Sequence, residues 1–232
     1  MFRFKQFEIH DELSAMKIGT DGVLLGAWAD IAEARSILDV GTGTGLVAIM
    51  CAQRNEHAMV HGIDIVEDAI VEARQNVART PWHDRITMEH ADLRDFDTQV
   101  RYDHIVTNPP FFLTSLHSPD AARAMARHAT SLSYEDIISA AERLLNEGGR
   151  LTVILPVDCA AVFRRVAFER LWLNRIIDVV TREGEAPKRT IMEFVLTDKP
   201  LMPCATSLTI QAADGSYTED YRHLTKEFYL NF

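Results

Sequence analysis

Hydrophobic and polar residues follow two different periods along this chain. Apolar runs of four to seven residues alternate with longer segments in which apolar positions recur every three or four residues. Short apolar runs are typical of buried strands, and the longer segments are typical of helices with one buried face. This alternation predicts an α/β fold, in which helices cover both faces of a mostly parallel sheet.

The pattern places seven strands and four clear helices. The strands are predicted at residues 36–40, 59–65, 85–90, 103–107, 150–156, 174–181 and 190–197. The helices are predicted at residues 46–53, 67–79, 134–145 and 158–168, and Gly148 and Gly149 are expected to end the third helix. A further strand-like piece, SLTIQA at 207–212, precedes the tail. Without repeats or a linker, residues 1–232 are expected to form a single domain with a core at 36–200.

Composition narrows the class of protein. Hydrophobic residues make up 47% of the chain and charged residues 25%, as in ordinary globular proteins. The sequence has no apolar run of the roughly 18 residues that a membrane span needs, and no signal-peptide core, so we expect a cytoplasmic protein without membrane partners. The cysteines Cys51, Cys159 and Cys204 are far apart and lack CxxC spacing, which predicts neither a disulfide framework nor a metal site.

The negative charge is unevenly distributed. The formal net charge is −10; residues 1–150 hold 14 Lys and Arg against 23 Asp and Glu, whereas residues 151–232 hold 10 against 11. Such a balance argues against a protein that holds nucleic acid by its overall charge. A polyanionic partner would have to meet local basic groups.

A glycine-rich turn joins the first predicted strand to the first predicted helix. The sequence LDVGTGTG places Gly41, Gly43 and Gly45 where a backbone can approach a ligand closely. The turn lacks the GxGxxG spacing of dinucleotide sites and the GK[ST] ending of nucleoside triphosphate sites. Asp64, at the end of the second strand, could instead accept both hydroxyls of a ribose, and Asp92 after the third strand could accept an adenine amino group. Capping of the following segments is an alternative role for both carboxylates.

The fourth core strand ends abruptly in the sequence NPPFF. Pro109 and Pro110 fix the backbone direction after Asn108 and leave carbonyl oxygens free to accept hydrogen bonds. Asn108 and the Pro109 carbonyl could accept from the two N–H groups of a planar amine, and Phe111 could stack on the ring that carries it. A simple strand stop is the alternative interpretation.

Together, LDVGTGTG, Asp64, ADL at 91–93 and NPPF at 108–111 resemble the class I S-adenosylmethionine-dependent methyltransferases that modify the exocyclic amino group of adenine. The resemblance implies a Rossmann-like fold and S-adenosylmethionine as the cofactor. It implies a catalytic role for Asn108, Pro109, Pro110 and Phe111. It implies cofactor contacts for Asp39, Gly41, Thr42, Gly43, Gly45, Asp64, Ile65, Asp92, Leu93 and Asn108.

The first 40 residues resemble one family more closely. The stretch FEIHDELSAMKIGTDGVLLGAWA, with RAMARH at 123–128 and LTKEFYL near the end, is similar to the bacterial tRNA(Val) adenine-N6 methyltransferases. The resemblance implies that residues 1–35 cover the cofactor, with contacts from Lys17, Gly19, Thr20 and Asp21. It implies an adenosine next to the tRNA anticodon as the substrate. A protein glutamine amide, an adenine of ribosomal RNA or DNA, and a small-molecule amine stay open as alternatives.

Local basic residues are candidates for RNA contact. Arg123 and Arg127 have helical i,i+4 spacing, and residues 160–190 carry seven Lys and Arg, including Lys188 and Arg189, against four acidic residues. A solvated helix face is the alternative for each of them. The protein is expected to be a monomer or a weak dimer.

Overall fold

The computed structural model describes residues 1–13, 17–110 and 132–231. Its centre is an eight-stranded sheet of order β10-β8-β9-β7-β6-β3-β4-β5. The strands are β3 (Ser36–Val40), β4 (Met59–Asp64), β5 (Ile86–His90), β6 (Tyr102–Thr107), β7 (Leu145–Pro156), β8 (Trp172–Arg182), β9 (Arg189–Val195) and β10 (Cys204–Gln211). Only β9 runs antiparallel to its neighbours β7 and β8. A separate antiparallel pair, β1 (Phe2–Arg3) and β2 (Glu8–Ile9), lies near the N-terminus.

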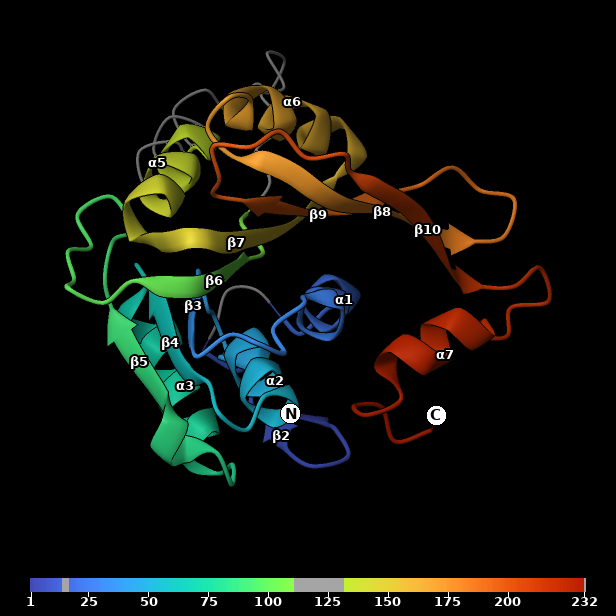
Figure 1. The fold of residues 1–232 in the computed structure, drawn as a ribbon. Helices are drawn as coiled ribbons and strands as arrows, with labels where there is room; N and C mark the ends of the chain where they lie inside the picture. The colour runs from blue at the N-terminus through green and yellow to red at the C-terminus, as the bar shows by residue number, and fades with distance from the viewer. Residues whose placement is uncertain (14–16, 111–131, 232) are drawn as a thin grey trace, which may run out of the picture.

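Helices cover both faces of this sheet (Figure 1). They are α1 (Thr20–Trp28), α2 (Leu46–Arg54), α3 (Glu67–Ala78), α5 (Tyr134–Leu144), α6 (Val157–Ala167) and α7 (Glu219–Thr225), with a short 3-10 turn, η1 (His83–Arg85). One hydrophobic cluster joins the sheet to α1, α2, α3, α7 and the N-terminal segment, and a second cluster joins it to α5 and α6. The predicted α/β fold with helices on both faces is therefore confirmed.

The strand count is eight, not the seven that the pattern predicts. The strand-like piece expected at 207–212 begins earlier, at Cys204, and pairs in parallel with β8 at the edge of the sheet. Its first four residues are exposed, so the hydrophobic signal that marks a buried strand is absent there.

The expected helix stop at Gly148 and Gly149 is wrong. Helix α5 ends at Leu144 and β7 begins at the next residue, so both glycines lie within the strand. The register between β6 and β7 shifts at this point. A Cβ on Gly149 would lie 2.7 Å from the backbone oxygen of Asn146, so close backbone approach explains this glycine.

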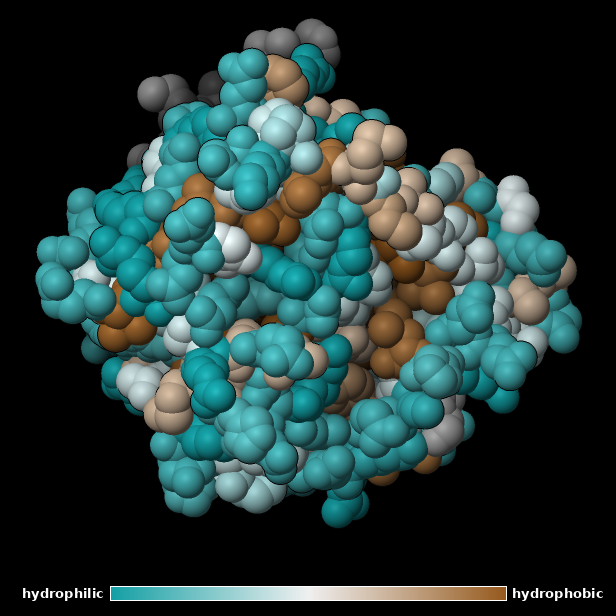
Figure 2. Space-filling view, in the orientation of Figure 1, coloured by the Kyte–Doolittle hydropathy of each residue, from teal (hydrophilic) through white to brown (hydrophobic). Residues whose placement is uncertain are grey.

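Hydrophilic residues cover most of the face seen in Figure 2, and hydrophobic residues reach that surface in smaller areas between them. No helix of the described residues is long and apolar enough to cross a membrane. The feature that positions the site is the carboxyl edge of β3, β4, β5 and β6. Because these strands are parallel, the segments that follow them meet at one edge of the sheet, where α/β proteins commonly bind ligands.

Candidate active site

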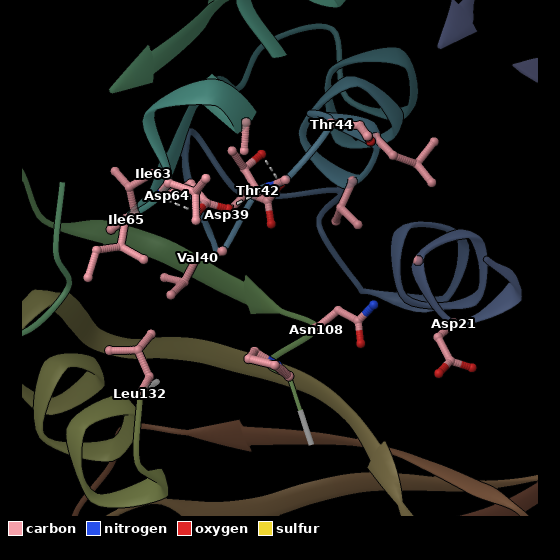
Figure 3. A pocket seen from close by; sticks show the side chains of 18 of the residues that line it. Asp21, Asp39, Val40, Thr42, Thr44, Ile63, Asp64, Ile65, Asn108 and Leu132 are labelled. Carbon is pink, nitrogen blue, oxygen red and sulfur yellow. Dashed lines mark hydrogen bonds between the residues drawn. The ribbon is translucent and has the colours of Figure 1, made fainter. Parts of the chain in front are cut away.

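A cavity of about 670 Å³ opens at the carboxyl edge of the sheet. Its walls come from the turns after β3, β4, β5 and β6 and from the start of α1 (Figure 3). Arg189, at the start of β9, also lines the cavity. Strand β9 is antiparallel, so its first residue reaches the same edge as the last residues of its neighbours. Four successive strand ends thus build one cavity from segments far apart in the sequence.

The glycine turn forms one wall of the cavity. Gly41, Gly43 and Gly45 have φ angles of 69°, 54° and 82°, which lie in the left-handed region that favours glycine. A Cβ on Gly41 or Gly43 would meet nothing within 4 Å among the described atoms, so both leave open space at the wall. Gly45 is different: it precedes α2, and a Cβ there would lie 3.2 Å from Met88 Cε, so this glycine serves packing.

Asp64 holds the glycine turn against β4. The Gly43 N–H donates to Asp64 Oδ2 at 2.9 Å, and the Val66 N–H donates to Oδ1 at 2.9 Å. Each carboxylate oxygen can accept two hydrogen bonds, so each keeps one acceptor position, and Asp64 lines the cavity. The carboxylate therefore orders the turn and can also accept from a ligand. It is not the capping residue of α3, whose N-cap is Val66 and has no side-chain cap.

Asp39 lies deeper in the same wall. It is 2% exposed, and its Oδ2 accepts from the Thr42 hydroxyl at 2.6 Å and from the Ala48 N–H at 3.1 Å. Burial raises the pKa of Asp39 to about 7, although these hydrogen bonds act in the opposite direction. Asp39 therefore ties the glycine turn to the start of α2.

Asp92 forms a fork-shaped ion pair with Arg94. Arg94 Nε lies 2.9 Å from Oδ1 and 3.0 Å from Oδ2, Nη2 lies 2.5 Å from Oδ2, and the Arg94 N–H donates to Oδ1 at 3.0 Å. The hydrogen bond from the Arg94 side chain holds the pKa of Asp92 below its ordinary value. Asp92 lines the cavity, but its acceptor positions are already engaged by Arg94.

Asn108 lies at the opposite end of the cavity. Its side-chain oxygen is buried and has no hydrogen-bond partner among the described residues. A buried acceptor without a partner costs about 1–3 kcal/mol, so native proteins rarely keep one without a reason. Figure 3 shows Asn108 and Asp21 on the side of the cavity away from Asp39 and Asp64. This end of the cavity therefore offers an acceptor to a ligand that donates an N–H or O–H group.

An ion pair joins the start of α1 to the start of β9 at the wall of the cavity. Arg189 Nε lies 2.7 Å from Asp21 Oδ2, and both residues line the cavity. Lys17 Nζ donates to the backbone oxygen of Asp11, so the segment before α1 is tied back to the N-terminal chain. An acidic and a basic group thus stand together near Asn108.

Most of the residues predicted for cofactor contact come together here. The residues that line the cavity are Lys17, Gly19, Thr20, Asp21, Asp39, Gly41, Thr42, Gly43, Asp64, Ile65, Asp92, Leu93 and Asn108, with Pro110 from the predicted catalytic set. Two predicted residues, Gly45 and Pro109, are not among the lining residues. Phe111, Arg123 and Arg127 lie outside the described residues.

Two of the four basic residues named for RNA contact, Lys188 and Arg189, lie within the described residues and take different positions. Lys188 is exposed and pairs with Glu185 at 3.0 Å. Arg189 belongs to the cavity instead of to an outer basic surface. The basic count along the sequence could not separate these neighbours, because the difference between them lies in their partners: Asp21 for Arg189 and Glu185 for Lys188.

Sequence reasoning missed several lining residues. They are Ile18, Gly22, Val40, Thr44, Leu46, Val47, Ile63, Val66, Ala69, Ala91 and Leu132. Most of them are small or apolar residues next to predicted ones, and in a sequence such residues look like ordinary core. Among the described residues, no group of three or more His, Cys, Asp and Glu side chains is arranged to hold a metal ion.

The fold and cavity place this chain among the methyltransferase folds. A solved structure described as a predicted O-methyltransferase from Agrobacterium tumefaciens matches with a TM-score of 0.73 and 20% identity, covering 90% of this chain and 96% of that one. TrmN from Thermus thermophilus matches with a TM-score of 0.55 and 21% identity, covering 75% of this chain and 48% of that one. At such identities the likeness concerns the fold alone.

Sequence comparison gives the family. The model of the methyltransferase small domain matches residues 15–161, and the chain belongs to that family. It is 42% identical to the tRNA1(Val) (adenine(37)-N6)-methyltransferase of Bacteroides thetaiotaomicron over 99% of this chain and 97% of the relative. It is 44% identical, with the same coverage, to the enzyme of that name from Phocaeicola vulgatus.

Proposed function

We propose that this protein transfers a methyl group from S-adenosylmethionine to the N6 amino group of an adenosine in tRNA. The relatives' name, shared at about 40% identity over nearly the whole chain, supports adenosine 37 of a valine tRNA as the target. The observation that carries the proposal is the buried side-chain oxygen of Asn108, which has no partner among the described residues and lies at one end of the cavity.

The residues of the cavity fit this cofactor. Gly41 and Gly43 leave room beside the turn, and Asp64 keeps an acceptor position on each oxygen, as a ribose with two hydroxyls requires. Asp92 can accept from an adenine amino group only if one of its hydrogen bonds from the Arg94 side chain breaks. The backbone of Ala91–Leu93 is therefore the better candidate for contacts to the base. When bound, S-adenosylmethionine supplies an electrophilic methyl group on a positively charged sulfur.

Asn108 addresses the main chemical difficulty of the reaction. The lone pair of an adenine amino nitrogen is delocalised into the ring, which makes the nitrogen a poor nucleophile. Acceptance of hydrogen bonds from its N–H groups, by Asn108 and by the Pro109 carbonyl, favours a pyramidal nitrogen whose lone pair points outward. Because Pro109 and Pro110 fix the backbone, these acceptors need no rearrangement when the new N–C bond forms and the S–C bond breaks.

The product needs no strong base in the cavity. An N-methylated adenine cation is acidic and loses its proton to water, so the proposal requires neither a metal ion nor a catalytic histidine. Phe111 is proposed, from the sequence alone, as the stacking surface for the target base.

We further propose that the whole chain acts as one catalytic domain and is a monomer or weak dimer. We also propose a cytoplasmic location, because its substrate is tRNA.

Labelled cofactor tests both the reaction and the substrate class. The protein is incubated with methyl-labelled S-adenosylmethionine and, separately, with total tRNA, ribosomal RNA, DNA and a release factor carrying a glutamine acceptor. We expect label in tRNA, recovered as N6-methyladenosine after nuclease digestion. Label in the release factor would replace the proposal with glutamine methylation, and label in DNA or ribosomal RNA would overturn the tRNA substrate.

A matched pair of transcripts tests the position. Unmodified valine tRNA with adenosine at position 37 should accept one methyl group per molecule, and the same transcript with guanosine 37 should accept none. Equal labelling of the two transcripts would show that another adenosine is the target.

A further inference from the structure

Two polar side chains are buried on α3, where a helix packed on a sheet would ordinarily present apolar residues. Glu72 is 2% exposed and Asn76 is 0% exposed. Their i,i+4 spacing places them on one face of the helix. Burial of a carboxylate and an amide is unfavourable unless both are hydrogen-bonded, so their partners indicate what they do.

Asn76 joins the N-terminal segment to the glycine turn. Its Nδ2 donates to the backbone oxygen of His10 at 2.9 Å and to the backbone oxygen of Thr44 at 2.9 Å. Its Oδ1 accepts from the His10 N–H at 3.0 Å. Thr44 lies in the glycine turn and lines the cavity. The side-chain amide of Asn76 therefore links the backbone of His10 to the backbone of Thr44 in the cavity wall.

Glu72 holds the same segment three residues further on. The Leu13 N–H donates to Glu72 Oε1 at 2.8 Å. Between these two anchors, Asp11 contacts the start of the cavity-lining segment 17–21. Its backbone oxygen accepts from Lys17 Nζ, and its Oδ2 accepts from the Ile18 N–H at 3.5 Å. The contacts form a chain from α3, through residues 10–13, to the cavity-lining residues 17–21.

We propose that Glu72 and Asn76 are positioning residues that hold residues 17–21 over the cavity and thereby set how long a bound nucleoside cofactor stays there. Neither side chain lines the cavity; both act through the N-terminal segment, and Asn76 acts also through Thr44. The inference rests on the proposed function for the identity of the ligand. Asp21, the last of these residues, also pairs with Arg189 at the start of β9.

The first test replaces Asn76 by aspartate, which keeps the acceptor for the His10 N–H but removes both donors. The free protein is examined by hydrogen exchange, and the dissociation of S-adenosylhomocysteine is followed by stopped flow. We expect faster exchange of the amides of residues 8–13 and 17–21, and dissociation about tenfold faster than in the wild type. Gln75→Glu, on the exposed side of the same helix, adds the same charge and should change neither quantity.

A merely structural role would give a different result. Asn76→Asp would then lower the free energy of unfolding and speed exchange throughout the sheet, while the dissociation rate of S-adenosylhomocysteine, measured well below the unfolding transition, would stay within twofold of the wild type. That outcome would overturn the inference. In the methyl-transfer assay, the inference requires a higher KM for S-adenosylmethionine with little change in kcat.

A second pair of variants leaves α3 intact, in case Asn76→Asp does not fold. Leu13→Pro removes the N–H that donates to Glu72, whereas Leu13→Ala keeps it; the Leu13 side chain is 53% exposed, so little packing is lost. We expect S-adenosylhomocysteine to dissociate about fivefold faster from Leu13→Pro than from Leu13→Ala. Equal rates would overturn the inference. Failure of the wild type to bind S-adenosylhomocysteine would instead overturn the proposed function.

Discussion

The two ends of the cavity satisfy their polar groups in different ways. At the glycine-turn end, Asp39 and Asp64 accept hydrogen bonds from the backbone of their own fold. At the other end, Asp21 pairs with Arg189, but the side-chain oxygen of Asn108 is buried and has no partner among the described residues. Both ends stand at the carboxyl edge of the same sheet, so their position in the fold does not explain the contrast.

At the first end, hydrogen bonds within the protein engage the carboxylates. At the second end, the Asn108 oxygen is left for a ligand to engage. The carboxylates at the first end stabilise the turn whether or not a ligand is bound, and replacing them should affect binding and the fold together. The side-chain oxygen of Asn108 accepts no hydrogen bond from the described residues, so its replacement should affect the reaction more than the fold. The following predictions test this division, from the largest expected effect to the smallest.

Asn108→Ala should lower kcat for methyl transfer by about 10²–10³-fold, the loss found when one preorganised hydrogen-bonding group is removed from a catalytic site. Affinity for S-adenosylhomocysteine, measured by calorimetry, should stay within about threefold, because most of the cofactor contacts lie on the other walls. Thr107→Ser, one residue earlier and buried in β6, provides a control for disturbance of the strand end. Near wild-type turnover in Asn108→Ala would remove its assigned role.

Asp64→Ala should weaken S-adenosylhomocysteine binding by about 10–100-fold, because a charged acceptor is lost and the Gly43 N–H is left without its partner. The free energy of unfolding should fall as well, by about 1 kcal/mol, since the same carboxylate orders the turn. Asp68→Ala, at an exposed position in the first turn of α3, is the matched control. Unchanged affinity would show that Asp64 serves the turn alone.

Asp39 should make stability depend on pH. In the unfolded chain its pKa is near 3.8, and burial raises the folded value to about 7. Between these values the folded protein binds the proton and the unfolded chain does not, so the free energy of unfolding should fall as pH rises from about 4 to about 7. Urea unfolding at pH 5 and pH 7 should show a decrease of about 2 kcal/mol in the wild type relative to Asp39→Asn. A pH-independent difference would contradict the raised pKa.

Much of the fold follows from local patterns. Each predicted core strand is present within two residues at its C-terminal end, because a buried parallel strand reads as a continuous apolar run. The pattern fails where burial is partial or backbone contacts decide. The exposed start of β10 carries no such run, and Gly149 ends no helix because the approach of the Asn146 carbonyl requires it within β7.

The site could be predicted as far as its residues follow strand ends. The turn at Gly41–Gly45, Asp64 and Asn108 stand directly after predicted strands, and parallel strands bring such positions to one edge. Glu72 and Asn76 could not be predicted in this way, because their role depends on hydrogen bonds to residues about 60 positions earlier in the chain. The role of Arg189 likewise depends on the antiparallel direction of one strand.

Replacement of Arg189 tests the end of the cavity that contains Asn108. We expect its guanidinium, held by Asp21 near Asn108, to contact a phosphate next to the target adenosine, so Arg189→Ala should raise KM for tRNA about tenfold. Because one phosphate contact is lost, the dependence of log Kd on log salt should weaken by about one unit. Lys188→Ala removes a neighbouring charge that pairs with Glu185 outside the cavity, and should change KM less than twofold. Equal effects in the two variants would mean that general positive charge, and not a specifically positioned guanidinium, attracts the RNA. A higher KM for the cofactor in Arg189→Ala would instead mean that the pair with Asp21 supports cofactor binding.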